Sequence, residues 1–166
     1  MVALSLKARA LRLLATREHS RSELARKLER PRSDGVVPDA AEVAAVLDAL
    51  VAEGWLSDAR FAASLARRRG RKYGNLRIAR ELRSHGLDPD VVAGTVGGEI
   101  EGSELSRALE ALRRRHPDRA VDARTLARQQ RFLLARGFSA GTVRRALRAH
   151  NDVDSELSPD IDPDSP

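Results

Sequence analysis

The chain has 166 residues, a formal net charge of +6, five aromatic residues and no cysteine. The lack of cysteine excludes disulfides, thiolate zinc sites and cysteine nucleophiles, and it fits a reducing compartment, so we expect a cytoplasmic protein. Lys7, Arg9 and Arg12 interrupt the apolar N-terminal stretch. Neither a signal peptide nor a membrane span is therefore expected.

Charge is divided unevenly along the chain. Residues 1–150 contain all 30 Lys and Arg residues against 18 Asp and Glu residues, whereas residues 151–166 contain six acidic residues and no basic residue. A basic folded part favours a polyanionic partner, either nucleic acid or an acidic protein surface. Arg outnumbers Lys 27 to 3, which a high-GC genome would also produce, so composition alone leaves the partner open.

Helical periodicity extends over residues 1–150, and glycine and proline breaks divide it into about nine helices without a strand pattern. Glycine followed by an apolar residue recurs every 51 positions, at Gly35-Val36, Gly86-Leu87 and Gly137-Phe138. Glycine suits the position after a helix because it tolerates the left-handed conformation. Asp88 and Ser139 then offer N-caps for the next helices.

This spacing predicts an all-α protein of three tandem three-helix repeats, stacked into an elongated, curved array. The predicted repeats are residues 1–56, 57–99 and 100–150. The alternative is one irregular helical bundle in which the two matched spacings arise by chance. Residues 151–166 are rich in proline and acid, so we expect a disordered tail that either solubilises the protein or competes with a polyanion for its basic face.

No catalytic or nucleotide-binding motif occurs in the sequence: GxGxxG, GxxxxGK[ST], HExxH and GxSxG are all missing. We therefore expect neither an enzyme nor a bound cofactor. His19, His85, His116 and His150 lie far apart in the sequence, and we expect them at the surface rather than in a metal site.

The densest charge lies in residues 60–80, which contain eight basic residues and no acidic one. Phe61 and Leu65 form part of an apolar stripe on the first of two helices, which leaves most of the basic residues outside the stripe. Guanidinium groups bind phosphate or carboxylate oxygens through paired hydrogen bonds, whereas a merely solvated face is the alternative. Off the stripe lie Arg60, Arg67, Arg68, Arg71 and Lys72, and on the second helix Arg77 and Arg80, three positions apart, share an outer face. The two helices therefore present basic residues around one corner, and we expect this patch to bind a polyanion. Within residues 60–80, Tyr73 is the only ring expected outside the apolar stripe and so available for stacking, which argues against single-strand recognition on aromatic platforms.

The segments SRSELARKL and VAAVLDALVAEGWL have a sequence pattern similar to that of a winged helix-turn-helix DNA-binding domain. In such a domain the next segment forms a β-hairpin. Here that segment, SDARFAASLARRR, is helical by its period and is capped by Ser57 or Asp58. The sequence therefore predicts no wing.

The segments GWLSDARFAASLARRR and YGNLRIARELRSHGLD, with SELARKL before them, resemble the central pattern of the RecX family of recombinase regulators. The resemblance covers roughly residues 5–149 and implies three tandem three-helix repeats in a bacterial cytoplasmic protein. We expect this protein to be a monomer. It implies binding to the RecA filament and to single- and double-stranded DNA through phosphate contacts. Such binding would restrain ATP hydrolysis, strand exchange and filament growth in DNA repair and the SOS response.

The resemblance also implies roles for single residues. By position on the family pattern, the residues that would contact filament or DNA are Arg67, Arg68, Arg71, Lys72, Arg77 and Arg80. Phe61, Leu65, Ile78, Leu82 and Leu87 would lie in the core, Asp58 would cap its own helix, and Gly74 and Gly86 would serve the backbone conformation. A nonspecific basic nucleic-acid-binding protein and a helical transcriptional regulator remain the alternatives.

Overall fold

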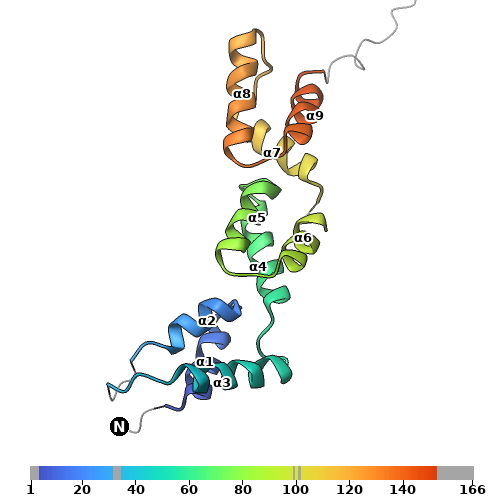
Figure 1. Ribbon diagram of the computed structural model, residues 1–166. Coiled ribbons are helices and arrows are strands. Elements are labelled where there is room, and N and C mark those ends of the chain that lie inside the picture. Colours follow the sequence, from blue (N-terminus) through green and yellow to red (C-terminus); the bar gives the residue numbers. More distant parts are fainter. Residues whose placement is uncertain (1–3, 32–34, 99, 101, 153–166) are drawn as a thin grey trace, which may run out of the picture. The chain divides into compact units, whose positions relative to one another are not determined.

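The computed structural model describes residues 4–31, 35–98, 100 and 102–152, and within these ranges it has nine helices and no strand (Figure 1). In chain order the helices are α1 (Leu6–Thr16), α2 (Arg21–Leu28), α3 (Ala40–Ala52), α4 (Asp58–Gly70), α5 (Asn75–Ser84), α6 (Pro89–Gly97), α7 (Glu104–Arg115), α8 (Ala123–Ala135) and α9 (Ala140–Asn151). The all-α class predicted from the sequence is confirmed. Apart from Asn151 and Asp152, the predicted tail lies outside the described residues.

The described residues divide into two compact units. The first covers residues 4–69 and 78–100 within the described ranges, and the second covers residues 70–77 and 102–152. The second unit therefore combines α7, α8 and α9 with a short segment from earlier in the chain, which carries three of the predicted binding residues.

Side-chain caps set the starts of most of the helices. A Ser or Asp side chain accepts a backbone N–H from the first turn at Ser5, Ser20, Asp88, Ser103, Asp122 and Ser139. Such caps satisfy one of the N–H groups that a helix start leaves without an internal acceptor. The predicted caps Asp88 and Ser139 are thus confirmed.

The three glycine corners have the backbone that their spacing predicted. Gly35, Gly86 and Gly137 adopt φ values of 80°, 72° and 79°. A side chain is strained in this left-handed region, whereas glycine is not. The corners therefore depend on glycine for their conformation.

Helix α4 occupies the place where a winged domain would have its hairpin, in agreement with the prediction. Ser57 Oγ accepts the N–H of Arg60 at 3.2 Å and so caps this helix. Asp58 does not: its Oδ1 accepts the N–H of Arg21, the first residue of α2, at 2.7 Å. The prediction that Asp58 caps its own helix is wrong, because its carboxylate satisfies the start of a different helix of the first unit.

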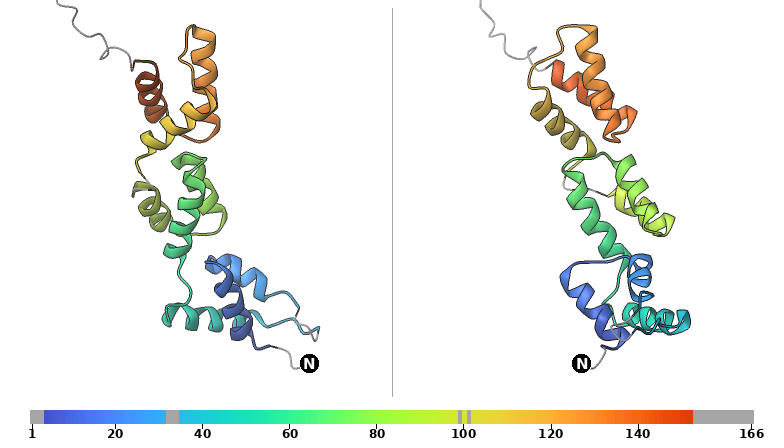
Figure 2. Two further views of the ribbon diagram at one scale, coloured as in Figure 1. Left: turned by 180° about the vertical axis from the view of Figure 1, so that it is seen from behind. Right: turned by 90° about the vertical axis from the view of Figure 1, so that its left-hand side faces the viewer.

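Each unit is built on aliphatic packing. In the first unit, α1, α2 and α3 pack together around buried residues that include Leu24, Leu28 and Leu50. The five residues assigned to the core of the next helices, Phe61, Leu65, Ile78, Leu82 and Leu87, are all buried as predicted. In the second unit, α7 packs against both α8 and α9 (Figure 2).

Two of the four histidines contradict the surface prediction. His19 is 1% exposed and His150 is 7% exposed. His85 and His116 are partly buried and stack edge-on against Phe61 and Phe132, with ring centroids 5.0 and 5.2 Å apart. Each of the two buried rings has a polar neighbour: His19 Nδ1 lies 3.1 Å from Glu23 Oε1, and His150 Nε2 lies 3.4 Å from the carbonyl of Asp118. Such neighbours offset the cost of burying the ring nitrogens.

Neither a membrane span nor a metal cluster is found in the part of the chain that the structure describes. No helix there is long and apolar enough to cross a membrane. No group of three or more His, Asp or Glu residues there could hold a metal ion.

Candidate polyanion-binding site

Within the second unit, backbone hydrogen bonds join the basic segment 70–77 to the turn between α8 and α9. The N–H of Gly74 donates to the carbonyl of Arg136 at 2.9 Å, and the N–H of Leu76 donates to the carbonyl of Gly137 at 3.1 Å. A Cβ added to Gly74 would lie 2.3 Å from both Gly137 O and Phe138 N. Gly74 is therefore required because two backbones approach each other closely here. Of the two glycines predicted to serve the backbone conformation, Gly86 has a positive φ, 72°, and Gly74 does not.

A buried arginine holds the same segment from α7. Arg107 is 6% exposed. Its Nη1 donates to the carbonyls of Tyr73 and Gly70 at 3.0 and 3.3 Å, and its Nη2 donates to Asn75 Oδ1 at 2.5 Å. A charge buried in this way is stabilised only when such acceptors surround it.

Glu104, one turn before Arg107, accepts hydrogen bonds from two directions. Its Oε1 accepts the Asn75 N–H at 2.9 Å, and its Oε2 accepts the Thr142 and Ser139 hydroxyls at 2.7 and 3.0 Å. Burial alone would raise the pKa of this carboxyl, but the hydrogen bonds outweigh burial and lower the pKa below its usual value. Glu104 and Arg107 together position the segment that carries Arg71, Lys72 and Arg77.

The segment borders a cavity of about 860 Å³ in the second unit. Six cations line it, together with Tyr73, Ala111, Phe132 and Ala135. The six are Arg71, Lys72, Arg77, Arg114, Arg115 and Arg136, and no acidic residue is found among the described residues of its wall. So many like charges around one hollow favour a multiply charged anion. We call this cavity the arginine cavity.

Several of these cations are held by contacts within the unit. The Arg136 Nη1 donates to the carbonyl of Lys72 at 2.9 Å, and its Cζ lies 4.5 Å from the centre of the Phe132 ring. The Cζ of Arg77 lies 4.1 Å from the centre of the Tyr73 ring. Cation–π contacts of this kind orient a guanidinium without neutralising it. The arginine cavity is thus partly preorganised for an anion.

The structure gathers only part of the predicted binding set. Arg71, Lys72 and Arg77 line the arginine cavity, whereas Arg67, Arg68 and Arg80 are exposed residues of the first unit. The neighbouring Arg69 is also exposed, and it pairs with Glu81 at 2.6 Å.

Three cations of the arginine cavity were not predicted from the sequence: Arg114 and Arg115 of α7, and Arg136, which follows α8. One signal was available for the first two. The run Arg113–Arg115 forms the last turn of α7, where cations interact favourably with the helix dipole and lie close together. Arg136 joins the cavity because the end of α8 contacts the segment 70–77, and the local sequence does not indicate this contact.

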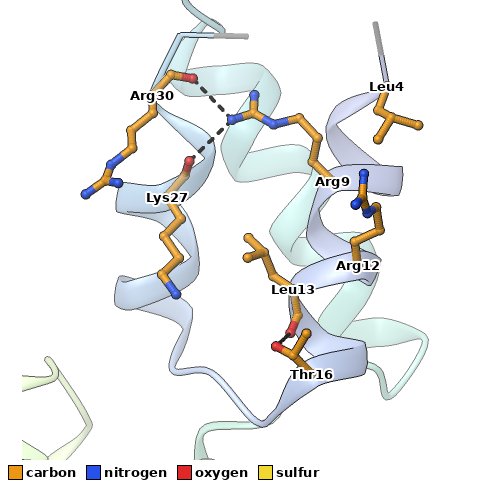
Figure 3. A pocket seen from close by; sticks show the side chains of 7 residues that line it. All are labelled: Leu4, Arg9, Arg12, Leu13, Thr16, Lys27 and Arg30. Atoms are coloured by element: carbon orange, nitrogen blue, oxygen red, sulfur yellow. Dashed lines mark hydrogen bonds between the residues drawn. The ribbon is translucent and has the colours of Figure 1, made fainter. Parts of the chain in front are cut away.

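A second cavity, of about 520 Å³, lies between α1 and α2 in the first unit (Figure 3). Its wall is mixed, with Leu4 and Leu13 beside four cations. Arg9, one of these cations, donates to the carbonyls of Lys27 and Arg30 at 3.4 and 3.3 Å and so satisfies the end of α2 (Figure 3). Lys27 pairs with Glu23 at 3.1 Å. Two of the four cations of this cavity are thus engaged by groups of α2 or of the residues that follow it.

Comparison with family models gives two matches along the chain. Residues 57–95 match the model described as RecX, second three-helix domain, and residues 103–147 match the model described as RecX, third three-helix domain. The matched ranges correspond to α4–α6 and α7–α9.

Curated relatives and solved structures agree with these matches. The Regulatory protein RecX of Leptothrix cholodnii is 50% identical over 145 residues, which are 87% of this chain and 88% of that protein. The Regulatory protein RecX of Herminiimonas arsenicoxydans is 45% identical over 89% of this chain and 94% of its own. The crystal structure of RecX from Lactobacillus salivarius, at 17% identity, has a TM-score of 0.71 and covers 89% of this chain and 95% of that chain. That last likeness concerns the fold alone.

Proposed function

This chain belongs to the RecX family of regulatory proteins, and we propose that it acts on the RecA recombinase by binding the RecA filament on DNA. Bound there, it restrains ATP hydrolysis, strand exchange and filament growth, and so limits recombination during DNA repair and the SOS response. Its high identity to regulatory proteins over most of its length supports this function.

The observation that carries the proposal at the residue level is the arginine cavity. Three of its cations, Arg71, Lys72 and Arg77, project from a segment that Arg107 and Glu104 hold in place, so this segment loses little conformational freedom when an anion binds. Guanidinium groups pair with phosphate oxygens of any nucleotide sequence. We propose that the cavity residues, together with Arg67, Arg68 and Arg80 of the first unit, contact DNA phosphates or acidic groups of the filament.

A regulator of this kind works through differential affinity. If the protein binds one conformational state of the filament more tightly than another, it shifts the filament toward that state by the difference in binding free energy. A bound protein that favours a state unable to hydrolyse ATP or to add subunits therefore slows both processes. No catalytic group of the regulator is needed for this effect.

The test is single-strand-DNA-dependent ATP hydrolysis by RecA of the same organism, titrated with the protein below the amount that coats the DNA. DNA binding by the protein alone is measured at the same salt concentration. We expect inhibition at substoichiometric amounts. If ATP hydrolysis falls only when the protein saturates the DNA, a nonspecific basic DNA-binding protein explains the result and the proposal fails.

A double charge reversal tests the predicted contact residues. Arg77→Glu with Arg80→Glu is expected to abolish binding to the RecA–DNA filament while the helical content measured by circular dichroism stays the same. The matched control is Arg144→Glu with Arg145→Glu, an exposed pair on α9 outside the arginine cavity. Unchanged affinity of the Arg77 and Arg80 variant would refute the assignment of these two residues.

A further inference from the structure

The arginine cavity and the C-terminal residues of the same unit have opposite charge. The wall of the cavity carries six cations. Residues 153–166, which follow α9, contain five acidic residues and no basic one. Like charges brought together around a hollow destabilise the fold unless anions compensate them. Glu110 pairs with Arg114 at 3.3 Å, and the acidic segment is a further anion that the chain itself carries.

We propose that the acidic segment 153–166 binds in the arginine cavity of its own chain and competes there with other polyanions. The carboxylates of Asp154, Glu156, Asp160, Asp162 and Asp164 would pair with the guanidinium groups of the cavity. The docking itself does not depend on RecA. Its regulatory consequence rests on the proposed function, because the segment would then mask the surface that contacts the filament.

Covalent geometry allows this segment to reach the cavity. The last residues of α9 contact the link between α7 and α8: the Ala120 N–H donates to Asn151 Oδ1 at 2.8 Å, and His150 Nε2 lies 3.4 Å from the carbonyl of Asp118. Arg115, a cavity residue, precedes Ala120 by five positions, so their Cα atoms are at most ~19 Å apart. A chain of fourteen residues spans up to roughly 46–50 Å when extended.

Binding of the acidic segment to the arginine cavity is also favoured because both belong to the same chain. A tethered anion of this length has an effective concentration near its site on the order of millimolar, which makes even weak ion pairs observable. Each exposed pair is weak alone and is screened by salt. The docking is therefore expected to be reversible and to weaken steeply as the salt concentration rises.

The cavity of the first unit is the alternative site for the acidic segment. The lysines of the chain distinguish binding in that cavity from binding in the arginine cavity. The chain has only three lysines, Lys7, Lys27 and Lys72. Lys72 lines the arginine cavity and Lys27 lines the first-unit cavity. A carbodiimide, which joins a carboxylate to a neighbouring amine as an amide, therefore reports which cavity the acidic segment occupies.

The experiment treats the full chain with a carbodiimide at low salt, digests it with trypsin and identifies the joined peptides by mass spectrometry. No Lys or Arg follows Arg148, so trypsin releases residues 149–166 as one peptide. Two ion pairs within the first unit, Lys7–Glu53 at 2.6 Å and Lys27–Glu23 at 3.1 Å, supply reference cross-links in the same sample.

We expect the C-terminal peptide joined to the Lys72 peptide, in a yield that is independent of protein concentration and falls several-fold at high salt. Mixing isotope-labelled and unlabelled protein shows whether the link forms within one chain. The proposal is overturned if the reference cross-links form without this product, if the segment joins Lys7 or Lys27 instead, or if the link forms only between different molecules.

Two sets of variants connect docking with function. Arg114→Gln with Arg115→Gln should reduce the Lys72 cross-link, whereas Arg144→Gln with Arg145→Gln should not. Changing the five acidic residues of the segment to Asn or Gln should tighten DNA binding about 3–10-fold at low salt, and this difference should vanish at high salt. An unchanged affinity overturns the competition.

These results remain separable from those on RecA. If the Lys72 cross-link forms but RecA is unaffected by the protein, the docking stands and the proposed function fails. If RecA is inhibited equally by the natural and the neutralised protein and no cross-link forms, the function stands and the docking fails.

Discussion

Gly74 and Gly137 meet backbone to backbone in the second unit, so that a Cβ on Gly74 would lie 2.3 Å from the carbonyl oxygen of Gly137. The contact brings the segment 70–77 onto the turn between α8 and α9. No rotation of a side chain relieves such an overlap, because both partners are main chain. The basic segment is therefore positioned by the absence of two side chains.

Gly74→Ala is expected to lower the free energy of unfolding of the second unit by about 1–3 kcal/mol, the usual cost of forcing an extra carbon into a packed contact. The matched control is Gly141→Ala in α9, where an added Cβ meets nothing within 4 Å. Urea denaturation measures the loss, and amide hydrogen exchange in α8 and α9 locates it. Equal stability of the two variants would contradict the close contact.

Asp58 gives a second prediction, because it caps a helix distant in sequence. Asp58→Ala removes the acceptor of the Arg21 N–H and should cost about 1 kcal/mol of stability, as the loss of an N-cap does. Asp58→Asn keeps an acceptor and should retain most of the stability. Thermal unfolding followed by circular dichroism measures both.

The control for Asp58 is Asp39, which stands at the N-cap position of α3 but makes no side-chain cap hydrogen bond. Asp39→Ala should leave the midpoint of unfolding nearly unchanged. A loss as large as that of Asp58→Ala would show that removal of an acidic charge near a helix start, rather than the Arg21 hydrogen bond, causes the effect.

Local features of this fold were readable from the sequence. The corners at Gly86 and Gly137 were predictable because the end of a helix imposes a local demand on φ that glycine meets, whereas Gly35 has a similar φ but lies seven residues after the end of α2. The burial of Phe61 and Ile78 followed from helical period. Each of these inferences depends on neighbours within one or two helical turns.

Features that depend on contacts distant in sequence were not readable. Asp58 reaches a residue 37 positions earlier, and Arg107 reaches Gly70 and Tyr73, 37 and 34 positions earlier. Arg107 lies beside Ala108 on the buried face of α7, where an apolar pattern gives no reason for a cation. Its burial is explained only by carbonyl groups that the fold brings to it. For the same reason, only three of the six cations of the arginine cavity were predicted, because three separate chain segments form its wall.

Glu23 gives a prediction that depends on pH. It faces Arg17, His19 and Lys27; His19 Nδ1 and Lys27 Nζ each lie 3.1 Å from its Oε1. Burial alone would raise the pKa of this carboxyl, but hydrogen bonds from Arg17 and Lys27 outweigh burial and lower the pKa to about 2. A carboxyl whose pKa is lowered by folding stabilises the folded state above its unfolded pKa, and that contribution is lost as the pH falls toward its folded pKa.

Glu23→Gln should therefore lower the free energy of unfolding by about 1–2 kcal/mol at pH 7, the scale of a charged hydrogen bond reduced by partial exposure of Arg17. The difference from the unaltered protein should shrink as the pH falls from about 4.5 to about 2. Urea denaturation at several pH values measures it. Glu42→Gln, at the equivalent third position of α3, is the control and should show a much smaller difference. A Glu23→Gln effect that is the same at pH 3 as at pH 7 would show that the carboxyl does not titrate in this way.

The last prediction concerns Arg114 and Arg115, which the arginine cavity adds to the residues predicted from sequence. If both contact phosphates, Arg114→Gln with Arg115→Gln should weaken DNA binding roughly tenfold at moderate salt. It should also reduce the slope of log affinity against log salt by about 1–2, because each phosphate contact releases close to one counterion. Fluorescence anisotropy with a labelled oligonucleotide at several salt concentrations measures both quantities.

The control is Arg144→Gln with Arg145→Gln, which removes the same charge from an exposed pair of neighbouring residues in the same unit. An effect of net charge alone would therefore change the DNA affinity and the salt slope of both variants equally. Equal slopes for the two variants would mean that the cavity is not where DNA binds.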